Sequence, residues 1–318
     1  ASTFSLINCN EAEKIVIDYN DLVKQAENIN SQLKPEYKDA FYQLVFHPIM
    51  ASANLNEIYL NVAKNKLYAE QGRASSNHYA KKVKELFEKD AEITNYYHKN
   101  LANGRWNHMM DQNHIGYKIW QEPNTIPETK TISPVKNAEA GVAIEGSKNW
   151  WPNVSEKALL PAFTSYNDNQ YYFDIFNRGT EPFKFKLKSE SNWLIFSKKE
   201  GTINQQERIN VKINWAKAPQ GINKTSFTIE ANKKLIPVYV QTNNINLKNI
   251  KGFVEANGYI VIEATNFSNK TESENFKWEI VENLGKTDGA VISLPVKKGR
   301  VELSKASPKL SYNVHFLT

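Results

Sequence analysis

The chain has 318 residues, and its 40 Lys and Arg residues outnumber its 34 Asp and Glu residues, which gives a formal net charge of +6 at pH 7. Hydrophobic residues make up 41% and charged residues 23% of the sequence, a composition typical of folded globular proteins and not of disordered ones. Its length is enough for two or three domains. No apolar run approaches the ~20 residues of a membrane-spanning helix.

The lysines are scattered along the chain, so the basic charge does not indicate a nucleic-acid partner, and it would equally suit an acidic polysaccharide. Cys9 is the single cysteine, which excludes an internal disulfide and a cysteine metal cage.

The first third of the chain has the spacing of helices. Over residues 10–33, apolar side chains recur in steps of three and four, and Asn10 with Glu13 has the spacing of a capping box. This pattern predicts a first helix that begins at Asn10.

Two further helices are predicted. One runs from Pro35 to about Gln71 with a bend at Pro48, and Gly72 is a plausible stop after it. The other covers about residues 75–101. Three long helices with short turns predict an antiparallel helical bundle.

After about residue 140 the pattern changes to short runs rich in β-branched and aromatic residues. The predicted strands are residues 141–146, 170–177, 182–188, 193–197, 207–215, 225–230 and 234–241. In PFKFKLK (182–188) apolar residues alternate with lysines, which indicates a sheet packed on one face and solvated on the other. These strands predict an immunoglobulin-like β-sandwich.

A second set of strands is predicted at residues 258–267, 276–283, 290–296 and 311–316. So few strands cannot close a sandwich. The predicted organisation is therefore a helical bundle with a C-terminal connector over residues 1–138, a β-sandwich over residues 139–247, and the start of a second, incomplete β-sandwich over residues 248–318.

The connector sequence GRWNHMMDQNHIGYKIWQEP (104–123) concentrates aromatic and titratable side chains. The candidates for residues close to a substrate or to the junction between domains are Trp106, His108, Asp111, His114, Tyr117 and Trp120. His108, Asp111 and His114 have the spacing H-x-x-D-x-x-H. On a helix these three side chains would point in different directions, but on a curved loop they could meet and bind a metal ion. We favour a hydrogen-bonded junction, with substrate contact and a metal-dependent enzyme as the alternatives, and we predict no metal and no cofactor.

Glycosidic hydrolysis needs two carboxyl groups facing each other across a cleft. The carboxylates near the connector are Glu57, Asp111, Glu122 and Glu145, and none has neighbours that would raise its pKa in a recognisable way. The sequence also lacks a G-x-S-x-G elbow and a phosphate-binding glycine loop. We therefore predict no catalytic residue in this chain.

Trp150 and Trp151 offer flat apolar faces on which a sugar ring could stack. The alternative is that they fill the core or the rim of the sandwich, as tryptophans in sandwiches usually do.

The connector and its flanks resemble glycoside hydrolase family 115, the xylan α-1,2-glucuronidases. The matching segments are residues 36–59, 67–75, 104–123, 173–185 and 252–267. The resemblance implies a parent enzyme with an N-terminal α/β domain, a catalytic barrel, a helical bundle and C-terminal β-sandwich modules. The family's proposed catalytic carboxylates lie on the barrel, so no residue of this chain inherits their role.

We therefore interpret the chain as the accessory C-terminal region of such an enzyme, and expect it to be inactive alone. The resemblance implies that the parent removes glucuronic acid or its 4-O-methyl ether from xylan by inverting hydrolysis. The expected partners are the upstream catalytic barrel, xylan or glucuronoxylan oligosaccharides and a second copy in a homodimer, without nucleic acid or a membrane span. A parent that degrades polysaccharide is expected in the periplasm or outside the cell. The alternative is a stand-alone carbohydrate-binding or surface interaction module.

Overall fold

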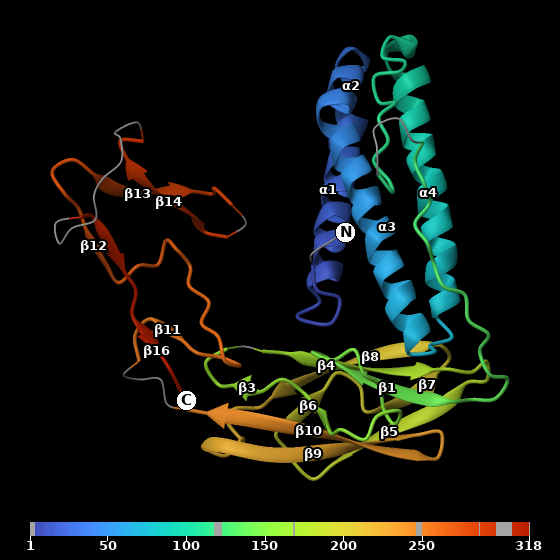
Figure 1. Ribbon diagram of the computed structural model, residues 1–318, viewed down its shortest axis with the longest axis vertical. Coiled ribbons are helices and arrows are strands. Elements are labelled where there is room, and N and C mark those ends of the chain that lie inside the picture. The colour runs from blue at the N-terminus through green and yellow to red at the C-terminus, as the bar shows by residue number, and fades with distance from the viewer. Residues whose placement is uncertain are drawn as a thin grey trace. The chain divides into compact units, whose positions relative to one another are not determined.

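The computed structural model describes residues 4–117, 123–167, 169–245, 250–285, 287–296 and 307–317 (Figure 1). These residues form two compact units. The first comprises Ala1–Pro161, Asn169–Ala218 and Lys224–Gln241, and the second comprises Ala162–Asp168, Pro219–Asn223 and Thr242–Thr318. In the described part of the chain, no helix is both long and apolar enough to cross a membrane.

The predicted order of a helical part followed by β-rich parts is confirmed. The helices are α1 (Glu11–Gln32), α2 (Pro35–Phe41), α3 (His47–Glu70) and α4 (Ser76–Lys99). A π-helical turn (Tyr42–Phe46) joins α2 to α3. The N–H of His47 donates to the carbonyl of Tyr42, five residues back, and the irregularity falls just before Pro48, which has no N–H to donate.

Gly72 ends α3, as the sequence predicts. The N–H of Gly72 donates to the carbonyl of Ala69, and the N–H of Arg73 donates to the carbonyl of Tyr68. Together with a φ of 67° at Gly72, these bonds form a Schellman motif.

The predicted capping box at the start of α1 is wrong. Asn10 has a φ of 51° and makes no side-chain cap bond. Its side-chain oxygen accepts a hydrogen bond from Arg208 instead, while Glu13 lies 3.3 Å from the ammonium of Lys64. Contacts with distant residues therefore replace the local motif.

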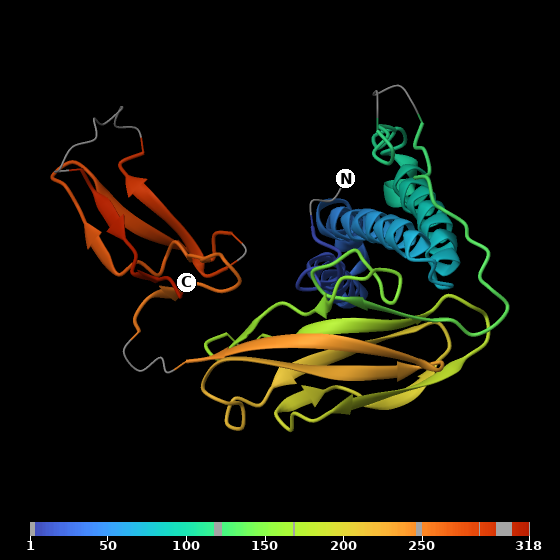
Figure 2. The same cartoon turned by 60° about the horizontal axis from the view of Figure 1, so that its bottom comes forward.

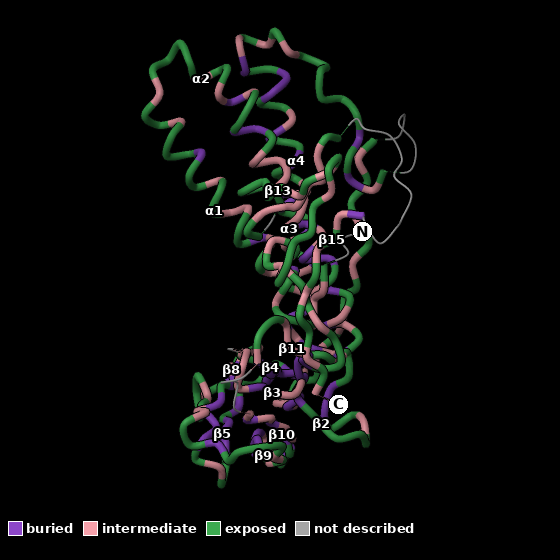
Figure 3. The backbone as a smooth tube through the Cα atoms, turned by 90° about the vertical axis from the view of Figure 1, so that its left-hand side faces the viewer, coloured by how far each residue is buried: buried purple, intermediate pink, exposed green. Residues whose placement is uncertain are grey.

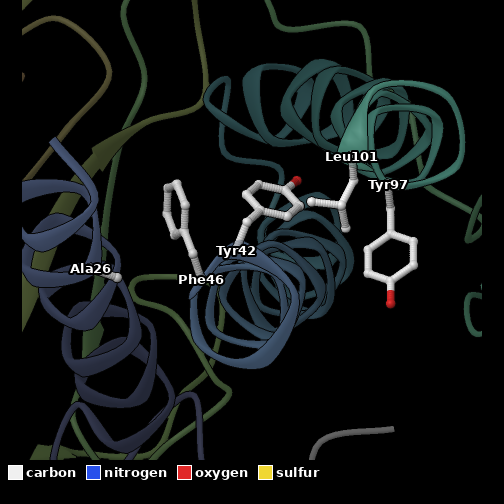
Figure 4. Packing of buried hydrophobic residues seen from close by; sticks show 5 residues of the cluster. All are labelled: Ala26, Tyr42, Phe46, Tyr97 and Leu101. Carbon is white, nitrogen blue, oxygen red and sulfur yellow. The ribbon is translucent and has the colours of Figure 1, made fainter. Parts of the chain in front are cut away.

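Three apolar clusters hold the helices together in the described part of the chain, and one of them joins α1 to α3 through Ala12, Val16 and Leu60. Figure 4 shows another, a row of side chains from α1, the π-helical turn, α4 and the 3₁₀ turn that follows α4 (Leu101–Gly104). Its members are Ala26, Phe46, Tyr42, Leu101 and Tyr97. The third joins α3 to α4 through Ile58, Val62, Val83, Leu86 and Ile115.

The β-rich part of the first unit contains two sheets (Figure 2). The first has the order β1 (Ala140–Ile144), β4 (Tyr171–Asn177), β8 (Gln206–Ile213), β6 (Leu194–Phe196). The second has the order β2 (Ala158–Leu159), β10 (Lys234–Asn244), β9 (Gly221–Ala231), β5 (Phe183–Ser189), β7 (Glu200–Ile203), and β3 (Phe163–Thr164) pairs with the end of β10.

The sheets meet through aromatic side chains. The ring centroid of Phe227 on β9 lies 5.3 Å from that of Phe173 on β4 and 4.8 Å from that of Phe196 on β6. Both β4 and β5 contain buried residues, and buried residues are drawn in purple in Figure 3. On β5 the three lysines point away from this core, since burial alternates along the strand.

The second unit contains three two-stranded sheets. They pair β11 (Phe253–Val254) with β16 (Val314–His315), β12 (Asn269–Thr271) with β15 (Lys309–Ser311), and β13 (Lys277–Glu282) with β14 (Gly289–Leu294). The predicted strand over residues 258–267 is wrong, since Tyr259 makes only an isolated bridge with Ala256. An alternating apolar run does not form a strand without an edge on which to pair.

Candidate functional site

The connector after α4 turns back along the helices. Ile115 is fully buried between α3 and α4. The side-chain oxygen of Asn124 accepts the N–H groups of His114 and Ile115 at 2.7 and 3.0 Å. The N–H of Gly116 donates to the hydroxyl of Tyr59 at 3.4 Å. These contacts hold the segment around Ile115 against α3 and α4.

His114 turns into the bundle and meets a buried carboxylate on α4. Its Nε2 lies 3.0 Å from Oδ1 and 2.9 Å from Oδ2 of Asp90, whose side chain is 4% exposed. The hydrogen bond to Asp90 raises the pKa of His114, an effect that partial burial of the ring opposes. The carboxylate of Asp90 therefore stabilises the protonated form of His114.

His108 and Asp111 form a separate, exposed pair. Nδ1 of His108 lies 2.7 Å from Oδ2 of Asp111, and His108 has a φ of 66°, a conformation that non-glycine residues adopt infrequently. On the other side, Nε2 of His98 lies 3.7 Å from Oδ1 of Asp111 and accepts the N–H of Met110 at 3.1 Å.

The three residues of the H-x-x-D-x-x-H spacing thus separate into two places, with His114 directed to Asp90 and His108 directed to Asp111. Among the described residues, no group of three or more histidine, cysteine or acidic side chains is placed to hold a metal ion.

The aromatic residues of the connector differ in position. Trp106 is partly buried against the cluster shown in Figure 4, whereas Tyr117 is 53% exposed. Trp120 lies outside the described residues, as does Glu122.

Trp150 and Trp151 are 9% and 6% exposed. The guanidinium of Arg178 lies 4.3 Å from the ring of Trp150, and the ring of Phe176 packs against Trp150 edge to face. The indole N–H of Trp151 donates to the carbonyl of Glu156. Both tryptophans therefore make interior contacts, and in this arrangement neither presents an open face to a sugar ring.

A buried ionic group that the sequence patterns did not indicate joins the helices to the first sheet. Asp174, at the centre of β4, lies between Arg73, just after α3, and Arg208 on β8. Its oxygens lie 3.0 Å from Nη1 of Arg73 and 2.7 Å from Nε of Arg208. Burial alone would raise the pKa of Asp174, but the two guanidinium groups outweigh burial and lower it.

Aromatic rings cover both arginines of this group. The guanidinium of Arg73 lies 4.0 Å from the ring of Tyr68, and that of Arg208 lies 3.6 Å from the ring of Tyr172. Arginine stacks on aromatic faces while it donates to carboxylates, which suits it to a buried position. One signal could have revealed this group: Asp174 is a lone charge within the otherwise apolar strand YYFDIF, and a buried charge requires a partner.

Glu145 anchors the N-terminal segment. Its carboxylate accepts the N–H of Cys9 at 2.6 Å and the N–H of Tyr172 at 3.0 Å. Burial raises the pKa of Glu145, and these two hydrogen bonds oppose the rise. The carboxylate is thus occupied by backbone groups.

The comparison with protein families gives one match. The sequence pattern of the glycosyl hydrolase family 115 C-terminal domain matches residues 252–318. Residues 252–318 are therefore similar to the C-terminal domain of this family. The resemblance inferred from the sequence is confirmed over this segment. A comparison with curated proteins gives no match.

Three solved structures are similar to parts of this chain. A Bacteroides ovatus GH5 xyloglucanase is 12% identical with a TM-score of 0.24, and the match covers 35% of this chain and 20% of that one. A PapD-like domain of human CEP192 is 11% identical with a TM-score of 0.25, and the match covers 40% of this chain and 97% of that one. A FixG-related protein from Vibrio parahaemolyticus is 12% identical with a TM-score of 0.23, and the match covers 36% of this chain and 100% of that one. This chain spans one fifth of the xyloglucanase. These TM-scores are too low to support an argument about fold or function.

Proposed function

We propose that this chain is the accessory C-terminal region of a xylan α-1,2-glucuronidase, whose catalytic barrel lies upstream in the same polypeptide. The parent removes glucuronic acid or its 4-O-methyl ether from xylan side chains by inverting hydrolysis. The observation that carries the proposal is the family 115 match over residues 252–318. In this proposal, residues 139–247 are an immunoglobulin-like sandwich, the unit from residue 248 is the start of another, and a second copy of the chain is a partner.

The environments of the carboxylates support an accessory role. A general acid and a general base must both reach the substrate, and the acid must hold its proton near neutral pH. Asp174 is buried with a lowered pKa, and Glu145 is buried beneath two backbone donors. Asp111 is exposed and pairs with His108. Asp174 and Glu145 are too buried to reach a substrate, and the carboxylate of Asp111 is already paired.

The contacts of the connector are those expected of a structural role. Asp90 holds His114, and Arg73 with Arg208 holds Asp174, so these contacts join the connector to the helices and the helices to the first sheet. Such an arrangement can position a neighbouring catalytic domain without taking part in the chemistry.

The test compares this chain with a longer polypeptide that joins it to the upstream barrel. Both are assayed for release of 4-O-methylglucuronic acid from aldouronic acids, and we expect release only by the longer polypeptide. Equal activity of the chain alone would contradict the accessory role. A longer polypeptide that is folded and inactive but binds xylan would instead support a binding module.

A further inference from the structure

A basic groove of about 800 Å³ lies on the second sheet, where β5 and β7 adjoin the turn between β9 and β10. The residues on which the argument depends are Lys184, Lys186, Glu200, Thr202, Glu230 and Lys233. Strand pairing places Lys184 opposite Thr202, and Lys186 opposite both Glu200 and Glu230. The groove is therefore a mixed polar surface and not the apolar surface that a second sheet would cover.

The positive charge of this groove is only partly compensated. The ammonium of Lys186 lies 3.9 Å from the carboxylate of Glu200, and that of Lys234 lies 3.9 Å from the carboxylate of Glu139. Among the residues that the structure describes, Lys184 and Lys233 have no carboxylate within 4 Å. These two ammonium groups are available to an anionic ligand.

Lys233 occupies an unfavourable backbone position. Asn232 and Lys233 form the two-residue turn between β9 and β10, with φ values of 46° and 64°. Both central residues of such a turn need a positive φ, and glycine is preferred at the second position. A lysine there costs stability, and strain of this kind is found at functional positions.

We propose that the groove of Lys184, Lys186 and Lys233 binds a carboxylate-bearing polysaccharide. This inference rests on the proposed function, because it assigns a uronate-bearing glycan as the ligand. The lysine ammonium groups pair with uronate carboxylates. Glu200 and Glu230 accept hydrogen bonds from sugar hydroxyl groups, and Thr202 donates to ring and hydroxyl oxygens.

The same two glutamates argue against a nucleic acid. A polymer with a phosphate at every residue would place negative charge against Glu200 and Glu230, whereas a xylan with spaced uronates has neutral sugars to set against them. The lining of the groove also lacks an exposed aromatic ring on which bases could stack.

The first experiment is affinity electrophoresis of the whole chain in gels that contain glucuronoxylan, polygalacturonate or neutral arabinoxylan. The groove variant Lys184→Gln with Lys233→Gly is compared with a matched control, Lys84→Gln with Lys89→Gln, which removes the same charge from exposed positions of α4. We expect the groove variant to bind the acidic glycans about tenfold more weakly than the wild type, since it loses two charge-assisted contacts. The control should bind like the wild type.

The single variant Lys233→Gly separates ligand binding from folding. Glycine relieves the strain at this turn, so the thermal midpoint should rise while affinity for glucuronoxylan falls. A purely structural role for Lys233 would leave binding unchanged.

Three results would overturn the proposal. The first is an equal loss of binding in the groove variant and the control variant, and the second is that neutral arabinoxylan retards the wild type as strongly as the acidic glycans do. The third is that the wild type binds duplex DNA more tightly than the acidic glycans. The proposed function is tested separately, because release of uronic acid from small aldouronic acids by the longer polypeptide does not depend on this groove.

Discussion

Nη1 of Arg73 lies 3.0 Å from Oδ2 of Asp174, and this contact joins the residue that follows the Schellman end of α3 to the centre of β4. Arg73 can make it because Gly72 turns the chain at the end of the helix. The local glycine signal and the distant ion pair therefore depend on each other, and together they fix the helices on the first sheet.

The ion pair should dominate the stability of this junction. Replacing Asp174→Asn leaves two guanidinium groups without their buried counter-charge, and we expect a loss of about 3–5 kcal/mol in the free energy of unfolding. Urea denaturation measures this loss. The matched control is Asp21→Asn, which removes an exposed partner of Lys24 and should change stability by less than about 1 kcal/mol. Equal effects of the two variants would contradict the structural role of Asp174.

The same residue predicts a response to acid. The pKa of Asp174 is lower in the folded chain than in the unfolded chain, so its contribution is present above the unfolded pKa of about 4 and is lost as pH falls through the folded pKa. A plot of unfolding free energy against pH should therefore fall more steeply for the wild type than for Asp174→Asn below about pH 4. Parallel curves would show that Asp174 does not titrate with folding.

The pairing of His114 with Asp90 predicts a loss of stability as the pH rises. Its pKa is raised in the folded chain, so its contribution is full below the unfolded pKa of about 6.5 and is lost as pH rises through the folded pKa. The His114 side chain is 37% exposed, and water screening limits the contribution to roughly 0.5 kcal/mol. The difference in unfolding free energy between the wild type and His114→Gln should shrink from pH 6 towards pH 8. An imidazole NMR titration with a midpoint below about 6.5 would contradict the raised pKa.

Gly72→Ala tests the end of α3. Alanine in the left-handed conformation costs about 1–2 kcal/mol, and its Cβ would also lie 2.8 Å from Nε of Arg178. Gly221→Ala is the matched control, since Gly221 also has a positive φ but has no atom within 4 Å of the added Cβ. Thermal denaturation should show the larger loss for Gly72→Ala. An equal loss would mean that Arg178 moves aside without cost.

Asp111→Asn tests whether the connector takes part in the chemistry. In the longer polypeptide, we expect this variant to keep kcat within roughly twofold of the wild type, because Asp111 pairs with His108 and lies near His98, both of which belong to this chain. Loss of a general acid or base would lower the rate by about 10² to 10⁴. A loss of that size in a folded variant would show that the connector lies in the active site.

Local signals in the sequence predicted the helices well, because Pro48 and Gly72 act on their own backbone. The start of α1 was predicted correctly. Its capping box was mispredicted because Asn10 binds Arg208, which is 198 residues away, and no local pattern records such a partner. The strand expected over residues 258–267 failed for a related reason: its alternation is local, but a strand also needs a neighbouring edge.

The candidate site was predictable only in part. His108 and Asp111 are three residues apart, so their pairing could be expected from the sequence. The pairing of His114 with Asp90 could not, because it depends on how the connector returns along α4. The two partners of Asp174 come from separate parts of the chain, just after α3 and on β8. Its burial could be anticipated from strand β4, but the identity of Arg73 and Arg208 could not.

The most direct test of the central claim is the initial rate of 4-O-methylglucuronic acid release from an aldouronic acid, measured for this chain alone and for the polypeptide that joins it to the upstream barrel. The accessory role predicts release by the joined polypeptide and none by the chain alone. Equal rates from the two proteins would contradict it.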